Sequence, residues 1–572
     1  MRGKLLEKVK KMSRDFYKKY EKLFPLISYS LSEYLANYEK ILKQKIKRIK
    51  QARICGNYGK QKYFELIKKY NKLPLIGENP KKLMKDLIAD FFSGIPRWKS
   101  PELVHNVGSP TNIVSSSIYS LALDENIYNI NEGLAGNTLI AEQIVVNHLS
   151  KLAKIKNQTI GFFTFGGTAT NLYAMKIGIK KADLLSGSKG ITKNLKAFIT
   201  EDSHFSHLVS ADWLGLGTDN VIVINANKDR TSNIHDAEIK MRKVLESGGL
   251  ISSIIINGGT TYDHTIDNIK EFVKLRDKLV VEYNLNYKPH LHVDSVIGWF
   301  WLFFNDYDWE KNSLKIDPKT LAVIKKQTKR ISQVRYADSW GVDFHKGIGG
   351  CPIPCSLIIL NNLEDINYLS KKKGKNIRMA QLAEELYSLS PVDFTLETSR
   401  PGGAPLAALA SLYSLGIRGF QKRLSDLISN SILLKEKLKQ QKDFFVCNYN
   451  SLGFVTMLRL YPPELNNDKR KFQEIEKKDE SGMSDFIKYV NNYLKKFFEW
   501  DFKTRIMENK GIEYSYTGCY IKLKNGEELS AIKIYPISPY FSNKTVDKIV
   551  LTLIKQKTKF DKYIWKNATK DF

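Results

Sequence analysis

The chain has 572 residues, 42% of them hydrophobic and 26% charged, and a formal net charge of +30. This length predicts several domains, and the composition is typical of globular proteins, which excludes a largely disordered chain. The longest apolar run, residues 295–304, has about half of the roughly 20 residues that a membrane-spanning helix needs.

Positive charge is concentrated near the N-terminus. Residues 1–100 contain 26 Lys and Arg against 9 Asp and Glu, a net charge of +17. Such a segment is compatible with binding to nucleic acid or to an anionic membrane, and equally with a solvated surface. Lysine is abundant throughout the chain, which favours the solvated surface, so we expect no nucleic-acid partner and no transmembrane segment. Residues 1–15 lack the apolar core of a secretory signal, and five cysteines are too few for a disulfide scaffold, so we expect a cytoplasmic protein.

The predicted elements divide the chain into three parts. Residues 1–105 predict a basic helical region, because apolar residues recur at three- and four-residue spacing, as at Leu31, Tyr34, Leu35 and Tyr38. Residues 106–415 alternate short β-branched runs with amphipathic segments, which predicts a large α/β domain with a mostly parallel sheet. Residues 416–572 predict a small α+β domain, with helices at 424–438 and 544–555 and strands at 444–450 and 531–537. The strands predicted in the large domain are 161–165, 197–200, 220–226, 252–258, 289–295 and 355–360.

One lysine lies in a segment rich in Gly and Pro, before a predicted strand. Lys346 precedes Gly347, and the apolar strand 355–360 follows shortly after. A loop at a strand entrance places this side chain inside the domain, and burial disfavours an ammonium ion. We therefore expect Lys346 to shift toward the neutral amine, the nucleophile that forms a Schiff base. In a chain so rich in lysine, a solvated surface amine is the alternative.

A second candidate, Asp294, ends the predicted strand 289–295. Open parallel sheets bind ligands at the carboxyl ends of their strands. An aspartate there suits a metal ion, a protonated ring nitrogen or the cap of the next turn. His290 and His292 share one face of the strand, but no further cluster of His, Cys or carboxylate residues accompanies them. A metal site is therefore not expected.

Two further motifs follow predicted strands. Gly166-Gly167-Thr168 lies between the strand 161–165 and a helical pattern, where backbone N–H groups and a helix N-terminus favour a phosphate. An ordinary helix cap is the alternative, and the segment does not fit the dinucleotide or P-loop patterns. His204 follows the strand that ends at Thr200, and by itself it is equally well explained as a polar residue of the interior.

Together, a phosphate cradle, a histidine, an aspartate and a lysine are the parts of a pyridoxal phosphate site. The strings GFFTFGGTATN, DSHFSH, GGTTYDHTID, LHVDS, ADSWGVDFHK and ETSRPGGAPLAALASL resemble the group II pyridoxal-phosphate-dependent amino acid decarboxylases. That family includes glutamate, aromatic amino acid, tyrosine and cysteine-sulfinate decarboxylases, and the resemblance covers residues 100–420. It implies an aspartate aminotransferase-like large domain, bound pyridoxal 5'-phosphate, and decarboxylation of an L-amino acid to an amine and CO₂.

The resemblance also implies catalytic roles for individual residues. Lys346 would hold the cofactor as a Schiff base, Asp294 would pair with its pyridine nitrogen, and His204 would stack on its ring. A tyrosine between the lysine and arginine motifs would protonate Cα. Tyr387 and Tyr368 both lie in that span, and Tyr387 is preferred by its distance from Arg400.

Further contacts to the cofactor are implied for residues near these motifs. Arg400 would lie near the site and position the dimer or the substrate. Five residues would contact the cofactor in addition to Lys346, Asp294 and His204: Gly167, Thr168, Thr261, Asp343 and His345.

The resemblance implies a homodimer with active sites shared between subunits, and it leaves the amino acid substrate open. A carbon–carbon lyase is a second interpretation, because TSRPGG and the Gly-Pro segment after Lys346 also resemble sphingosine-phosphate lyases. A third is a basic binding protein on an inactive enzyme fold. The presence of Lys346, Asp294 and His204 argues against that third interpretation.

Overall fold

A computed structural model describes residues 59–566, except 76, 93–94, 96–97, 371–389, 474–482, 509–510 and 524. The chain forms two compact units, Met1–Arg97 with Asp501–Gly511, and Trp98–Trp500 with Ile512–Phe572. In the first unit α3 (Gly59–Tyr70) and α4 (Pro80–Phe91) are helices, and Lys69 on α3 is 2.6 Å from Asp90 on α4. The periodic pattern at residues 31–38 lies outside the described residues.

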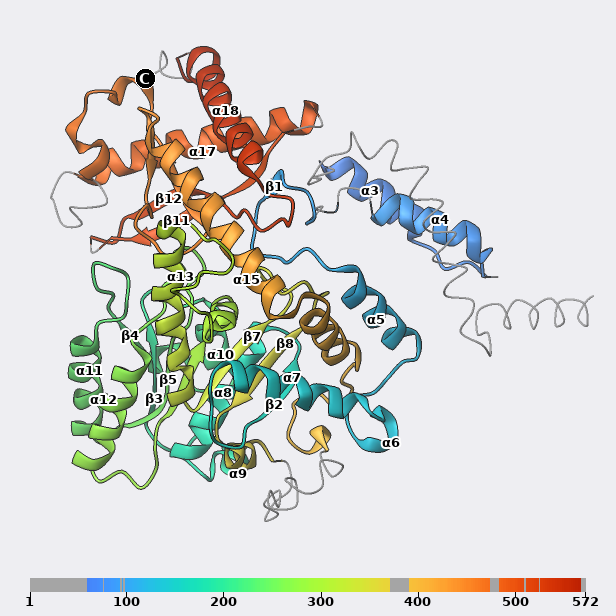
Figure 1. Cartoon of the computed structure of the whole chain (residues 1–572), viewed down its shortest axis with the longest axis vertical. Helices are drawn as coiled ribbons and strands as arrows, with labels where there is room; N and C mark the ends of the chain where they lie inside the picture. The colour runs from blue at the N-terminus through green and yellow to red at the C-terminus, as the bar shows by residue number, and fades with distance from the viewer. Residues whose placement is uncertain are drawn as a thin grey trace, which may run out of the picture. The chain divides into compact units, whose positions relative to one another are not determined.

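The larger unit is built on a seven-stranded sheet in the order β2-β8-β7-β6-β5-β3-β4 (Figure 1). Six of these strands run in one direction and β8 runs in the opposite one, between β2 and β7, so the predicted mostly parallel sheet is confirmed. Its strands are β2 (Ile160–Thr164), β3 (Leu195–Thr200), β4 (Val221–Ile224), β5 (Leu250–Asn257), β6 (His290–Asp294), β7 (Ser339–Asp343) and β8 (Ser356–Leu360).

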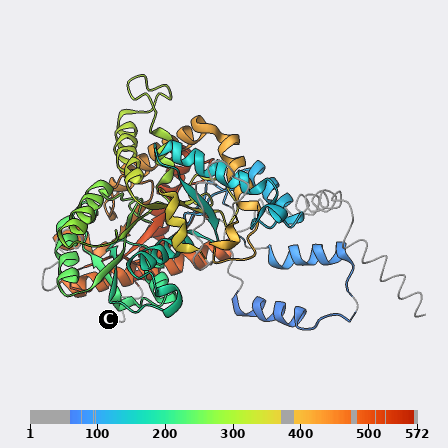
Figure 2. The same cartoon turned by 90° about the horizontal axis from the view of Figure 1, so that it is seen from below.

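Helices enclose this sheet, as the view in Figure 2 shows. Every residue of β2, β6, β7 and β8 is buried, as expected for strands covered on both faces. Among the helices, α8 packs against β5 to β8, and α11 packs against β4 and β5. The helices of the large domain are α5 (Ile113–Asp124), α6 (Glu132–Ala135), α7 (Thr138–Leu152), α8 (Gly167–Ala182), α9 (Ser186–Lys189), α10 (Ser206–Trp213), α11 (Ile234–Glu246), α12 (Ile269–Glu282), α13 (Pro318–Ile331) and α15 (Gly403–Lys439), which bends at Gly416.

The aromatic run after Asp294 belongs to the core. Trp299–Phe304 forms a 3-10 helix whose six side chains are all buried, and Phe303 stacks on Phe420 of α15 with ring centroids 4.1 Å apart. This helix passes close to the end of β5, because a Cβ on Gly298 would lie 1.7 Å from the carbonyl oxygen of Gly258.

A second, five-stranded sheet has the order β1-β11-β12-β10-β9. It contains β9 (Phe444–Val446), β10 (Thr456–Leu460), β11 (Glu513–Lys522) and β12 (Glu528–Ile534), together with β1 (Leu103–Val104), which pairs parallel to β11. The helices α17 (Met483–Glu508) and α18 (Asn543–Phe560) complete this part of the chain. The strands predicted at 444–450 and 531–537 correspond to β9 and β12, which end earlier, at Val446 and Ile534, and the predicted helix at 544–555 is confirmed. Among the helices of the described part of the chain, none combines the length and the apolar character needed to cross a bilayer.

Candidate active site

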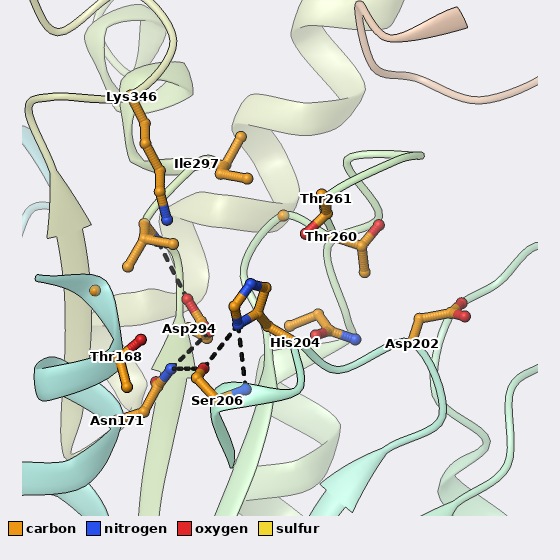
Figure 3. Close-up of a pocket in the computed structure, with 14 residues that line it drawn as sticks. Thr168, Asn171, Asp202, His204, Ser206, Thr260, Thr261, Asp294, Ile297 and Lys346 are labelled. Carbon is orange, nitrogen blue, oxygen red and sulfur yellow. Dashed lines mark hydrogen bonds between the residues drawn. The ribbon is translucent and has the colours of Figure 1, made fainter. Parts of the chain in front are cut away.

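A cavity open to solvent lies at the carboxyl ends of the strands of the large sheet. The segments that form its wall each come directly after a different strand. Open α/β sheets bind ligands at this edge, beyond the carboxyl ends of their strands. The polar and charged side chains of the wall come from α8, from the loops after β3 and β5, and from the ends of β6 and β7 (Figure 3). The lining residues are Gly167, Thr168, Asn171, Asp202, His204, Ser206, Asn257, Gly259, Thr260, Thr261, Asp294, Val296, Ile297 and Lys346.

Asp294, the last residue of β6, presents a buried carboxylate to this cavity. Its Oδ2 atom accepts hydrogen bonds from Nδ2 of Asn171 and Nε2 of His207, each at 3.0 Å. Burial would raise the pKa of the Asp294 carboxyl, but the His207 and Asn171 hydrogen bonds and the nearby Lys346 amine hold that pKa well below its usual range. Oδ1 has only a weak contact, 3.5 Å from the Val296 nitrogen, so it can accept a further hydrogen bond.

Lys346 lies in the turn after β7, with its side chain 22% exposed, and its Nζ is 2.8 Å from Oδ2 of the fully buried Asp343. The expected shift toward a neutral amine is wrong. Burial alone would lower the pKa of Lys346, but the Asp343 carboxylate beside it raises the pKa above its usual value. The expectation took account of burial and not of the carboxylate three residues earlier. Asp343 is also placed to accept the proton that Lys346 must lose before its amine can act as a nucleophile.

His204 follows β3, with its ring beside the space that the Lys346 amine and the Asp294 carboxylate both approach (Figure 3). Its Nδ1 accepts from the Ser206 backbone N–H at 3.2 Å and lies 2.9 Å from the Ser206 hydroxyl. Burial lowers the pKa of His204 below its usual value. A neutral imidazole fixed in this way can present a flat face to an aromatic ligand.

The turn between β2 and α8 forms the fourth part of the site. A Cβ on Gly167 would lie 2.7 Å from Oδ2 of Asp343 and 3.1 Å from Val296, so no side chain fits there. Gly166 has φ 148°, a conformation that side chains other than glycine disfavour. The first N–H groups of a helix have no acceptor within that helix, and here they belong to a 16-residue helix whose start lines the cavity. A buried carboxylate, an amine and an anion cradle around one cavity fit pyridoxal phosphate, which carries a ring nitrogen, an aldehyde and a phosphate.

The remaining predicted residues lie in different surroundings. Thr261 lines the cavity, and its carbonyl accepts a hydrogen bond from Tyr535. His345 is buried beside the site, with Nδ1 bonded to the backbone of Cys355 and Nε2 3.7 Å from Asp343. Tyr387 lies outside the described residues.

Arg400 is buried and does not line the cavity. It contacts Glu142 Oε1 at 2.6 Å and the carbonyl oxygens of Asn129 and Phe163 at 2.8 and 2.9 Å. In this chain it therefore ties the segment before α15 to α7 and β2.

The two histidines of β6 are buried residues of the core. His290 and His292 each lie 2.7 Å from the hydroxyl of Ser339 on β7, and burial lowers the pKa of both. Among the described residues, no group of three or more His, Cys, Asp and Glu side chains is arranged to hold a metal ion.

Asn171 and His207 were not singled out from the sequence. The Nδ2 group of Asn171 joins Asp294 to the Ser206 hydroxyl, at 3.0 and 3.3 Å, and His207 is fully buried behind Asp294. Both stand within the quoted motifs GFFTFGGTATN and DSHFSH. Nothing in the sequence indicated that either residue contacts Asp294, because both lie far from it along the chain.

Part of the chain is similar in sequence to known amino acid decarboxylases. No family model matches the chain. An L-2,4-diaminobutyrate decarboxylase of Rhizobium meliloti is 23% identical over 320 residues, which are 56% of each chain. Serine decarboxylase 1 of Oryza sativa is 25% identical over 304 residues, which are 52% of each chain. The chain thus spans about half the length of the curated relatives it matches.

Solved structures extend the agreement to the whole fold. The structure of Oryza sativa TDC with PLP and tryptamine superposes with a TM-score of 0.72, covering 94% of this chain and 99% of that one at 13% identity. The fold is that of the pyridoxal-phosphate-dependent amino acid decarboxylases. The aspartate aminotransferase-like domain and the resemblance predicted from the motifs are confirmed.

Proposed function

We propose that this protein uses pyridoxal phosphate to decarboxylate an L-amino acid, releasing CO₂ and the corresponding amine. The observation that carries the proposal is the placement of the Lys346 amine, the Asp294 carboxylate and the Gly166-Gly167 turn around one cavity. Bound there, pyridoxal phosphate would take up the electron pair that departing CO₂ leaves on Cα.

The protein's own groups would then act at defined atoms. Oδ1 of Asp294 is the oxygen available to hold the proton of a ring nitrogen, since Oδ2 is already bonded to Asn171 and His207. A carboxylate fixed in this way would keep the ring nitrogen protonated, and a protonated ring accepts an electron pair more readily than a neutral one. The Lys346 amine would hold the cofactor covalently once its proton has passed to Asp343, which is 2.8 Å away.

Protonation of Cα completes the reaction, and we assign it to Tyr387. The assignment is supported by the position of Tyr387 in the sequence, between Lys346 and Arg400. The group II decarboxylases, which the motifs resemble, carry a tyrosine on a mobile loop in this region. A Tyr387→Phe variant should still release CO₂ but give less amine per CO₂, because the substrate Cα then lacks its proton donor. Equal yields of amine and CO₂ in that variant would count against Tyr387.

We also propose a homodimer whose active sites are shared by both subunits. Large apolar side chains near the cavity are exposed in the single chain: Phe205 next to His204 is 69% exposed, and Phe165 next to Gly166 is 47% exposed. Exposed apolar side chains of this kind favour a covering partner. Deleting residues 1–100 should disturb the dimer in sedimentation experiments, and an unchanged active dimer would contradict that expectation.

A cytoplasmic location is part of the same proposal. In the described part of the chain Cys351, Cys355 and Cys519 are free thiols, as is usual in a reducing compartment.

The test is a panel of L-amino acids incubated with the purified protein and pyridoxal phosphate, scored for CO₂ and amine. L-2,4-diaminobutyrate and L-serine come first, because relatives are named for them. A phosphorylated sphingoid base, scored for aldehyde, tests the carbon–carbon lyase interpretation. The proposal predicts CO₂ release from at least one amino acid and none from the Lys346→Ala variant. Aldehyde release without CO₂ would replace the decarboxylase by the lyase.

A further inference from the structure

One wall of the cavity is a loop that the small sheet holds in place. The loop joins β5 to α12 and contributes Thr260 and Thr261 to the cavity, on the side away from Thr168 and Asn171 (Figure 3). Two hydrogen bonds between Thr260 and Thr265 close the base of the loop. The Thr265 N–H donates to the Thr260 hydroxyl at 3.0 Å, and the Thr260 N–H donates to the Thr265 carbonyl at 3.1 Å.

The tip of this loop, residues 261–263, is bonded to three different segments of the small sheet. The Tyr535 hydroxyl, just after β12, donates to the Thr261 carbonyl at 2.8 Å. The Tyr520 hydroxyl on β11 lies 2.9 and 3.0 Å from the two carboxylate oxygens of Asp263. The remaining contact is from the Asn448 side chain, after β9, to the Tyr262 carbonyl at 3.3 Å.

The donors in these contacts are themselves rigidly placed. Tyr535 is fully buried, Tyr520 is 8% exposed, and both belong to the hydrophobic core. A backbone carbonyl bonded to a buried phenol is held more firmly than one bonded to water, because the phenol has little freedom to move away. The position of Thr261 therefore depends on the packing of the small sheet.

We infer that Tyr535 is a positioning residue for the proposed reaction, fixing the Thr261 wall of the cofactor cavity from the small sheet. This inference rests on the proposed function. A residue that only stabilised the fold would affect unfolding but leave the affinity of the folded protein for the cofactor unchanged.

The experiment compares Tyr535→Phe with a matched control, Tyr493→Phe. Tyr493 is also fully buried, and its hydroxyl donates to Asp561 at 2.6 Å, with no contact to the loop. Each variant loses one hydroxyl that donates one hydrogen bond. Three quantities are measured for each: the unfolding midpoint, the Kd for pyridoxal phosphate by spectral titration, and hydrogen exchange of the peptide 260–265.

For Tyr535→Phe we expect a Kd for pyridoxal phosphate about fivefold higher, which corresponds to the loss of one ordinary hydrogen bond, and faster exchange in the loop. For Tyr493→Phe we expect a loss of stability at least as large, because its partner is a carboxylate, with the Kd and the loop exchange unchanged. If Tyr535→Phe is too unstable to purify, Tyr520→Phe takes its place with the same expectations. The inference would be overturned if the Kd and the loop exchange were unchanged in Tyr535→Phe or Tyr520→Phe. It would also be overturned if Tyr493→Phe changed both quantities equally. A wild-type protein that binds no pyridoxal phosphate would instead refute the proposed function.

Discussion

Replacing His207 with Phe tests how the Asp294 carboxylate is held. The change keeps a ring of similar size in a fully buried position and removes one of two hydrogen bonds on Oδ2, each 3.0 Å long. A hydrogen bond to a charged group contributes about 1.5–3 kcal/mol, equivalent to roughly 10- to 150-fold in a rate or equilibrium constant. We therefore expect kcat for decarboxylation to fall by about 10- to 100-fold, with the cofactor still attached to Lys346.

The same change has a defined pH dependence. The pKa of Asp294 is depressed in the folded chain, so its contribution to stability is present above the unfolded-state value near 3.8 and is lost as pH falls below it. Urea denaturation should show wild type more stable than His207→Phe at pH 7, by about 1.5–3 kcal/mol. The difference in stability should narrow once the pH falls below about 3.8, the unfolded-state value.

A rescue variant separates the hydrogen bond from packing. His207→Gln carries an amide donor of similar reach, so it should recover most of the lost kcat and stability. A kcat for His207→Phe within twofold of wild type, or a Gln variant as impaired as the Phe variant, would refute this account of Asp294.

Three further changes follow from the same contacts. Asp343→Asn should lower the pKa of Lys346, because Asp343 raises it, so the pH midpoint for covalent capture of pyridoxal phosphate should move down; an unchanged midpoint would show that the ion pair has no such effect. Gly167→Ala places a Cβ 2.7 Å from Asp343 Oδ2, so stability should fall by about 1–3 kcal/mol and the cofactor Kd should rise; an alanine variant with wild-type values of both would contradict the crowding of this turn. Arg400→Leu leaves Glu142 buried without its cation and should lower the free energy of unfolding by about 3–5 kcal/mol, measured in urea; a variant of unchanged stability and impaired substrate KM would favour a direct role in binding instead.

The strands and the order of the site motifs could be predicted from the sequence because their signals are local. A run such as 252–258 is a buried strand by its β-branched residues alone, and β5 spans Leu250–Asn257. Once the sheet is parallel, residues after β3 and at the end of β6 must meet at one edge, which brings His204 and Asp294 together. Strands β1, β7, β10 and β11 were not among the predicted strands. The sequences of β10 and β11, TMLRL and EYSYTGCYIK, mix polar and apolar residues.

Contacts between distant segments could not be predicted in this way. His207 reaches Asp294 across 87 residues and Arg400 reaches Glu142 across 258, and neither pairing leaves a pattern in a single sequence. The direction of the Lys346 pKa shift failed for a related reason. Burial was visible in the sequence as an apolar environment, whereas the orientation of Asp343 depends on how the turn after β7 folds back.

The proposed reaction depends on a covalent bond between the Lys346 amine and pyridoxal phosphate. It is tested most directly by reducing the loaded protein with borohydride, digesting it, and locating the attached cofactor by peptide mass spectrometry. We expect one modified peptide, containing Lys346, and no modification in the Lys346→Ala variant. A cofactor fixed on another lysine, or a reduced protein that carries none, would contradict it.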